Sequence, residues 1–101
     1  MIKEKRITNH TIIKAAEKVT GKPANVLRGA SRVSSVVAVR NLCFKIAKDH
    51  LFLADRDIAI AYNRDRSAVT YALKHVEKKL EKRPQYKLML EEIERELGLI
   101  Y

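Results

Sequence analysis

Apolar residues recur every three or four positions along most of the chain, which is the period of an α-helix with one buried face. The clearest stripe consists of Val69, Leu73, Val76 and Leu80. A shorter apolar pattern, Asp57–Tyr62, precedes this stripe, and the polar residues Asn63–Asp65 separate the two. Two helical patterns joined by a tight polar turn predict a helix-turn-helix.

The first part of the chain predicts two helices followed by a loop. Thr8 or Asn9 can cap the first helix, and Gly21 supplies its C-terminal stop. Pro23 fits the first turn of a short second helix. The small, polar and basic residues 29–34 are expected to form a loop.

Two more helices are predicted before and after the central pair. Ser34 or Ser35 can cap a long helix that runs to about His50. Arg83-Pro84 ends the second helix of the pair, because the residue before a proline disfavours the helical conformation. A last helix carries an apolar stripe that either closes the core of one chain or pairs two chains. That stripe contains Met89, Ile93 and Leu97.

The composition favours an all-α fold in one small domain. The chain has only 3 Gly and 2 Pro among its 101 residues, and its hydrophobic content of 47% suffices for a packed core. A chain of this length suits a single domain, to which we assign residues 1–101. Residues 1–7 are basic and lack a helical pattern, which indicates a flexible N-terminal arm.

The charge is strongly positive and unevenly distributed. The net charge is +9, from 21 basic and 12 acidic residues. Residues 85–101 contain two basic and four acidic residues and therefore carry −2, which leaves +11 on the first 84 residues. A basic body with an acidic C-terminal segment favours a polyanionic partner for the body.

No residue pattern indicates catalysis, a cofactor or a metal site. The single cysteine, Cys43, lies on an apolar helix face and is expected to pack in the core. The three histidines, His10, His50 and His75, fall in three different predicted helices without metal-ligand spacing. The N-terminus lacks a signal peptide and no apolar run could cross a bilayer, so we expect a cytoplasmic protein that is not an enzyme.

The candidate binding residues open the second helix of the predicted pair. They are Arg64, Asp65, Arg66 and Ser67. In helix-turn-helix motifs these positions enter the major groove of DNA. Arginine can donate two hydrogen bonds to guanine, and a carboxylate can accept one from cytosine. Asp65 also suits a helix N-cap, and the arginines could simply be solvated charges. Arg32 in the small loop could enter a minor groove.

Over roughly residues 11–97 the sequence resembles the C-terminal DNA-binding domain of the bacterial replication initiator DnaA. The family signature at the second helix is Gly-Gly-Arg-Asp-His-Thr-Thr-Val, where this chain has Asn63-Arg64-Asp65-Arg66-Ser67-Ala68-Val69. Upstream, Ala38-Val39-Arg40-Asn41-Leu42 and Ile46-Ala47-Lys48-Asp49 resemble the family's long basic helix. One glycine, the histidine and the threonine pair of the signature are replaced here.

The resemblance implies a role for each matching residue. Arg32 aligns with a loop arginine that enters the minor groove, and Arg40 and Lys48 align with phosphate-contacting positions. The segment from Arg64 to Ser67 aligns with the residues that read the major groove. The replacement of histidine by Arg66 departs from the family's usual DNA-site preference. The ATPase domain that normally precedes this region is not in the chain, so we expect a solitary DnaA-like module or an excised domain.

The resemblance further implies a nucleoid-associated protein connected with replication initiation or its regulation. Double-stranded DNA is the expected partner, with replication proteins as further candidates. Two alternatives stay open at this point. One is a transcriptional regulator of the Trp-repressor type, which needs a dimer, whereas we expect a monomer here. The other is a protein-interaction module that keeps the fold but has lost DNA contact, which the altered signature and the acidic C-terminal segment favour.

Overall fold

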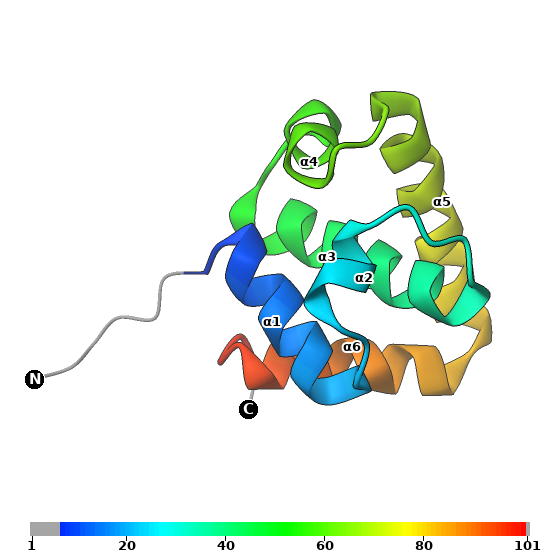
Figure 1. Ribbon diagram of the computed structural model, residues 1–101. Coiled ribbons are helices and arrows are strands. Elements are labelled where there is room, and N and C mark those ends of the chain that lie inside the picture. Colours follow the sequence, from blue (N-terminus) through cyan, green and yellow to red (C-terminus); the bar gives the residue numbers. More distant parts are fainter. Residues whose placement is uncertain (1–6, 101) are drawn as a thin grey trace, which may run out of the picture.

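Six α-helices and no β-strand make up the secondary structure of residues 7–100, the part of the chain that the computed structural model describes (Figure 1). They are α1 (Asn9–Thr20), α2 (Ala24–Arg28), α3 (Ser34–Leu51), α4 (Asp55–Tyr62), α5 (Arg66–Lys82) and α6 (Pro84–Glu96). The all-helical fold predicted from the apolar period is confirmed. Most of the expected N-terminal arm lies outside the described residues, but Ile7 packs against the core and is not part of an arm.

The first helix begins and ends as its sequence predicts. The Thr8 hydroxyl accepts a hydrogen bond from the Thr11 backbone N–H at 3.1 Å, and the Thr11 hydroxyl accepts one from the Thr8 N–H at 2.8 Å. This reciprocal capping box satisfies two N–H groups that the helix itself leaves without partners. Gly21 adopts a φ of 76° at the other end, a left-handed conformation that glycine adopts without steric cost.

The start of α3 differs from the prediction. Val33 occupies the N-cap position with extended backbone angles, and no side chain caps the helix. Ser34 and Ser35 are already inside the helix and exposed, so neither serine is the N-cap. An N-cap residue must keep a non-helical backbone conformation, and the chain turns into the helix one residue earlier than the serine pattern indicates.

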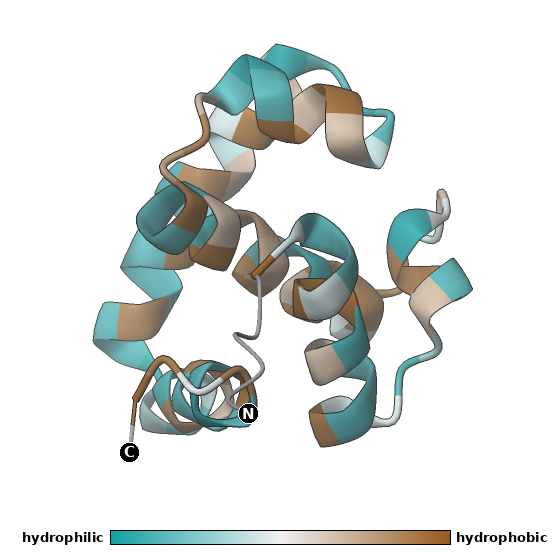
Figure 2. Ribbon diagram, turned by 90° about the vertical axis from the view of Figure 1, so that its left-hand side faces the viewer, coloured by the Kyte–Doolittle hydropathy of each residue, from teal (hydrophilic) through white to brown (hydrophobic). Residues whose placement is uncertain are grey.

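Helix α3 is the centre of the fold. It packs against α1, α2, α4 and α5, whereas α6 packs against α1 and α5 (Figure 1). All six helices turn their apolar sides inward and their polar sides outward (Figure 2). The Cα radius of gyration is 12.8 Å, close to the value of about 13 Å for a compact domain of 100 residues.

The apolar stripe of α6 closes the core of the single chain. Ile93 and Leu97 are buried, and Met89 packs against the core from its edge. The buried ring of Tyr86 donates a hydrogen bond from its hydroxyl to the Ala38 carbonyl at 2.7 Å, which ties α6 to α3. The apolar stripe of α6 is therefore covered by the core of its own chain and does not offer an apolar face to a second copy.

Cys43 lies in the core, as the sequence predicts. Its side chain is fully buried, and this burial raises the pKa of the thiol to about 12. The thiol therefore stays protonated at neutral pH and acts as a small apolar group. Within residues 7–100, no helix combines the length and the apolar character that crossing a membrane requires.

Helices α4 and α5 are joined by the predicted three-residue turn, Asn63–Asp65. Asn63 ends α4 with a φ of 52°, a left-handed conformation that asparagine tolerates better than most residues. The backbone N–H of Arg64 then bonds to the Ala59 carbonyl at 2.8 Å. This turn separates the two helices and directs the first turn of α5 into solvent.

A second left-handed residue, Phe52, ends α3 with a φ of 56°. Its ring is 86% exposed, so the side chain contributes almost no burial to offset the backbone strain. Phenylalanine is an unusual choice for this conformation, which glycine normally occupies at helix C-termini. The position is therefore a local source of instability at the entry to α4.

Replacing Phe52 by glycine should raise the free energy of unfolding by about 0.5–1 kcal/mol. The left-handed conformation costs a non-glycine residue about 1–2 kcal/mol, and the greater chain entropy of glycine cancels about 0.5–1 kcal/mol of the gain. Asn63→Gly is the matched control and should change stability less, because asparagine tolerates the same conformation. Urea denaturation would measure both effects, and a destabilised Phe52→Gly protein would contradict the assignment of strain.

Candidate nucleic-acid interface

Arg40 lies in the interior, which corrects the expectation that it contacts phosphate. Its side chain is 5% exposed. The guanidinium donates to the backbone carbonyls of Leu27 at 2.7 Å, Ser31 at 3.0 Å, Gly29 at 3.0 Å and Val26 at 3.4 Å. Four of its five N–H donors are therefore used within the chain. These four donors are not available to a DNA phosphate.

The carbonyls that Arg40 binds lie at the end of α2 and in the loop that follows, and the Val26 carbonyl also accepts from the Gly29 N–H at 3.1 Å. Val26 and Leu27 lie in the last turn of α2, and Gly29 and Ser31 lie in the loop that follows. A positive charge is also favoured at the C-terminal end of a helix dipole. Burial and the nearby charge of Arg64 lower the pKa of Arg40, but arginine remains protonated in proteins.

Arg64 converges on the same loop from the other side. Its guanidinium donates to the Gly29 carbonyl, which Arg40 also binds. A Cβ atom on Gly29 would lie 3.1 Å from the Asn25 carbonyl oxygen, so any other residue there would push the backbone of α2 away by a few tenths of an ångström. The loop of residues 29–33 is thus anchored by two arginines, one from α3 and one from the turn before α5. This contact gives Arg64 a structural role that its sequence position does not reveal.

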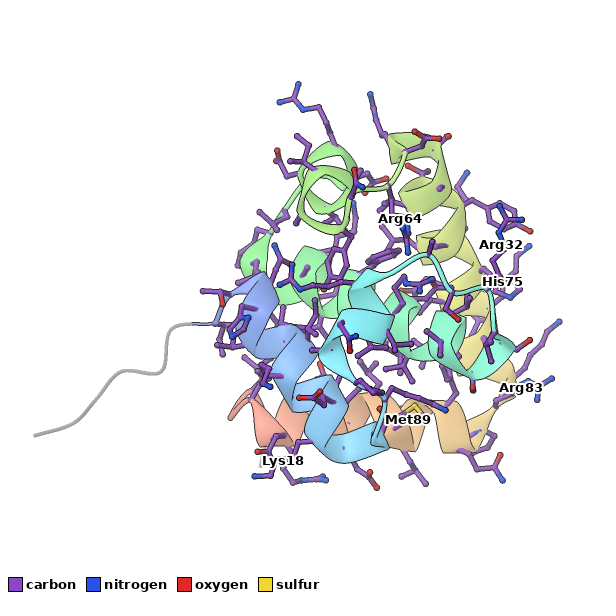
Figure 3. All side chains as sticks on the ribbon, viewed as in Figure 1. Lys18, Arg32, Arg64, His75, Arg83 and Met89 are labelled. Atoms are coloured by element: carbon purple, nitrogen blue, oxygen red, sulfur yellow. The ribbon has the colours of Figure 1, made fainter. Side chains whose placement is uncertain are left out.

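Arg32 projects from this anchored loop. It is exposed and forms no ion pair with any residue of the described chain. Figure 3 shows its side chain beside α5, on the same side of the molecule as Arg64 and His75. The contacts of Arg40 and Arg64 with the Gly29 carbonyl, and of Arg40 with the Ser31 carbonyl, hold the backbone that leads into Arg32. An exposed cation on a fixed loop is the arrangement that insertion into a groove requires.

Asp65, Arg66 and Ser67 open α5 and are all exposed. Asp65 occupies the N-cap position, as predicted, with extended backbone angles of −72° and 144°. Its side chain does not form the expected capping hydrogen bond. The carboxylate is consequently available to an external donor. Ala68 is also exposed and small, so little bulk separates the first turn of α5 from an approaching surface.

Lys48 forms an ion pair with Asp55 at 2.6 Å, although it remains 47% exposed. The other oxygen of Asp55 accepts from the Thr70 hydroxyl at 2.6 Å. These two contacts, Lys48 first, hold the pKa of Asp55 below its usual value, against the opposing effect of burial. Asp55 therefore links the end of α3, the start of α4 and the second turn of α5. Lys48 could contact phosphate only if its ammonium group bound Asp55 and phosphate together or if the ion pair with Asp55 broke.

A second ion-pair cluster fixes the same side of α5. Lys45 of α3 lies 2.9 Å from Asp49 and 2.6 Å from Glu77 of α5. Together with the Asp55 contacts, it sets the orientation of α5 relative to α3 and α4. Neither cluster was predicted from the sequence. Two signals for them are Asp55 in the first turn of a helix, where carboxylates are favoured, and the four-residue spacing of Lys45 and Asp49.

No group of three or more potential metal ligands comes together in the described part of the chain. His50 instead lies 2.9 Å from Glu94, which connects the end of α3 to α6. His75 stacks its ring on that of Tyr71, with centroids 6.2 Å apart and an interplanar angle of 8°. The histidines are thus dispersed, and two of the three have identifiable structural neighbours.

The comparisons with known proteins assign no family. No protein-family model matches this chain, and no curated protein matches its sequence.

Replacing Arg40 by methionine should lower the free energy of unfolding by about 2–3 kcal/mol. Methionine retains much of the volume but leaves the Leu27 and Ser31 carbonyls without donors, and each unsatisfied buried group costs about 1–3 kcal/mol. The Gly29 carbonyl keeps its contact with Arg64, and the Val26 carbonyl keeps the Gly29 N–H. Arg56→Met is the control, because Arg56 is exposed on α4 and surface changes usually stay within about 0.5 kcal/mol. Urea denaturation of both variants tests the difference. Equal stabilities would show that the four contacts contribute nothing.

Proposed function

We propose that this chain binds double-stranded DNA, with the α4–turn–α5 unit as a helix-turn-helix and α5 as the helix that enters the major groove. The observation that carries the proposal is the exposed first turn of α5. Asp65, Arg66 and Ser67 combine a carboxylate, a guanidinium and a hydroxyl there, none of which is bound to another side chain. Such groups suit base edges, and the N-terminal turn is the part of a recognition helix that reaches them.

The surroundings of α5 support this proposal. The anchored loop holds the exposed Arg32 on the same side as the turn (Figure 3). An arginine in a narrow minor groove can sense DNA shape. Lys48, near the end of α3, is proposed to contact phosphate after its ion pair with Asp55 breaks. Arg64 would contribute mainly by holding the loop next to the turn that precedes α5. Arg40 is not proposed as a DNA contact, because it is buried.

The resemblance to the DnaA C-terminal domain leads us to propose a DnaA-like module that acts in replication initiation or its regulation. The order of elements supports it, since a short helix, a loop, a long helix and a helix pair follow one another as the resemblance implies. Arg66 at the position of the signature histidine would alter the DNA sequence that is preferred. A monomer is the proposed binding form, because the apolar stripe of α6 packs inside its own chain.

The unaltered chain should bind duplex DNA with a strong dependence on salt. If five to seven phosphates are engaged, the log–log slope of affinity against salt should be about −4 to −6, from about −0.9 per phosphate. A selection from random duplexes would identify the preferred site, and titrations at several salt concentrations would give the slope. Absence of binding at low salt would instead favour a protein-interaction module.

Replacing Arg66 by alanine should cost about 1–3 kcal/mol of binding free energy on the selected site and less on a scrambled duplex, because the lost contact is to a base. Arg95→Ala is the matched control, since it removes the same charge from an exposed position near the end of α6. Fluorescence anisotropy with both duplexes measures the effect. An equal loss on the two duplexes would mean that Arg66 contacts only the backbone.

A further inference from the structure

A basic groove runs along the second half of α5, away from the residues proposed to contact bases. Two adjoining hollows form it, and they share His75 and Lys79 as lining residues. Arg32 and the start of α3 line the first hollow, and Lys78, Lys82 and Arg83 line the second. We call this surface the α3–α5 groove. Figure 3 shows Arg32, His75 and Arg83 following one another along this side of the molecule.

No carboxylate lines the α3–α5 groove within the described residues, although the chain has 12 acidic residues. The acidic partners of the five described lysine ion pairs, and Glu94 beside His50, all lie elsewhere. Glu77 of α5 contacts Lys45 on the opposite side of the helix. The groove cations form no ion pair among residues 7–100. Glu92 lines the neighbouring hollow that Lys79 and Arg83 also line, but no described carboxylate enters the lining of the groove itself. A concentration of cations of this kind attracts a polyanion.

The centre of the groove is held in a fixed arrangement. The ammonium group of Lys79 lies 4.5 Å from the centre of the Tyr86 ring. Tyr86 is itself buried and bonded to the Ala38 carbonyl. At the rim, the Tyr71 and His75 rings stack on each other. The groove therefore presents its charge on a surface that is already ordered, which lowers the entropy lost when a partner binds.

The groove lies too far along α5 to contact bases near the helix tip. At a rise of about 1.5 Å per residue, His75 is about 14 Å from Arg66 and Lys82 about 24 Å. The major groove is only about 8.5 Å deep. When α5 enters the groove by its N-terminal end, the first turn meets base edges and these cations lie at the level of the sugar–phosphate backbone. Arg32 lines the groove at the side where the loop meets α5, and it is the one groove residue for which we propose entry into the minor groove.

We propose that the α3–α5 groove binds the phosphate backbone of the same duplex whose bases meet the first turn of α5. This inference rests on the proposed function and extends the DNA footprint beyond the helix-turn-helix to the second half of α5. Lys78 and Lys82 supply charge to the groove without a structural contact of their own. The groove contributes affinity that does not depend on sequence, whereas Arg66 contributes the preference among sequences.

The test compares two double variants of the whole chain. Lys78→Gln/Lys82→Gln removes two exposed groove charges, and Lys18→Gln/Arg95→Gln removes two exposed charges on α1 and α6. Lys18 lies at the far side of the molecule from Arg32 and Arg83 (Figure 3). Lys79 is left unchanged because it also packs on Tyr86. Thermal melts establish that both variants fold, as the exposure of all four side chains leads us to expect.

Binding is measured by anisotropy on the selected and scrambled duplexes at several salt concentrations. The groove variant should lose about tenfold or more in affinity near 0.1 M salt, and its log–log slope should become shallower by about two, one for each phosphate contact. The ratio of affinities for the two duplexes should not change. The control variant should retain the slope of the unaltered chain.

The outcomes separate this inference from the proposed function. If the unaltered chain binds duplex and the groove variant matches the control, the groove is not a contact surface, although the helix-turn-helix proposal stands. If the groove variant changes the ratio between the duplexes, the groove reads sequence and the assignment to backbone is wrong. If the unaltered chain binds no duplex at low salt, the proposed function fails, and the groove assignment fails with it.

Discussion

The arrangement of this fold around its candidate interface depends on one buried cation. Arg40 projects from the central helix α3 and donates hydrogen bonds to carbonyls at the end of α2 and in the loop that follows. Without these donors the Leu27 and Ser31 carbonyls would have no partner among residues 7–100, and the loop would be held only at the Gly29 carbonyl. Arg64 adds a contact from the turn before α5. A core interaction thereby places the loop, the turn and the start of α5 next to one another.

The two sides of α5 differ in their charged residues. On one side, acidic residues pair with lysines of α3 and with Thr70, and these contacts fix the helix in place. On the other side, the groove cations form no ion pair among the described residues, and no carboxylate lines the groove. Surface ion pairs contribute little stability singly. Their more important effect here is to occupy the carboxylates, so that the positive potential of the groove side is not neutralised.

The proposed DNA contacts therefore divide into residues that act directly and residues that act through others. Arg66 and Arg32 are exposed and can reach a ligand, whereas Arg40 and Arg64 hold the backbone from which those two project. Phosphate contacts position a protein on DNA, and base contacts specify the sequence. A fixed loop and an exposed helix tip on one scaffold would let both kinds of contact form together.

The sequence by itself determined the six helices, the turn at Asn63–Asp65 and the break at Arg83-Pro84, because apolar periodicity, caps and proline act over a few neighbouring residues. It also placed Cys43 in the core correctly. Only the tertiary structure decided that Arg40 is buried, because its acceptors lie nine to fourteen positions away and meet it only when α2 folds back on α3. The pairing of Lys48 with Asp55 and the cation groove along α5 were likewise decided by packing. A basic residue looks the same in a sequence whether it faces solvent or a neighbouring carbonyl, and its environment exists only once distant segments come together.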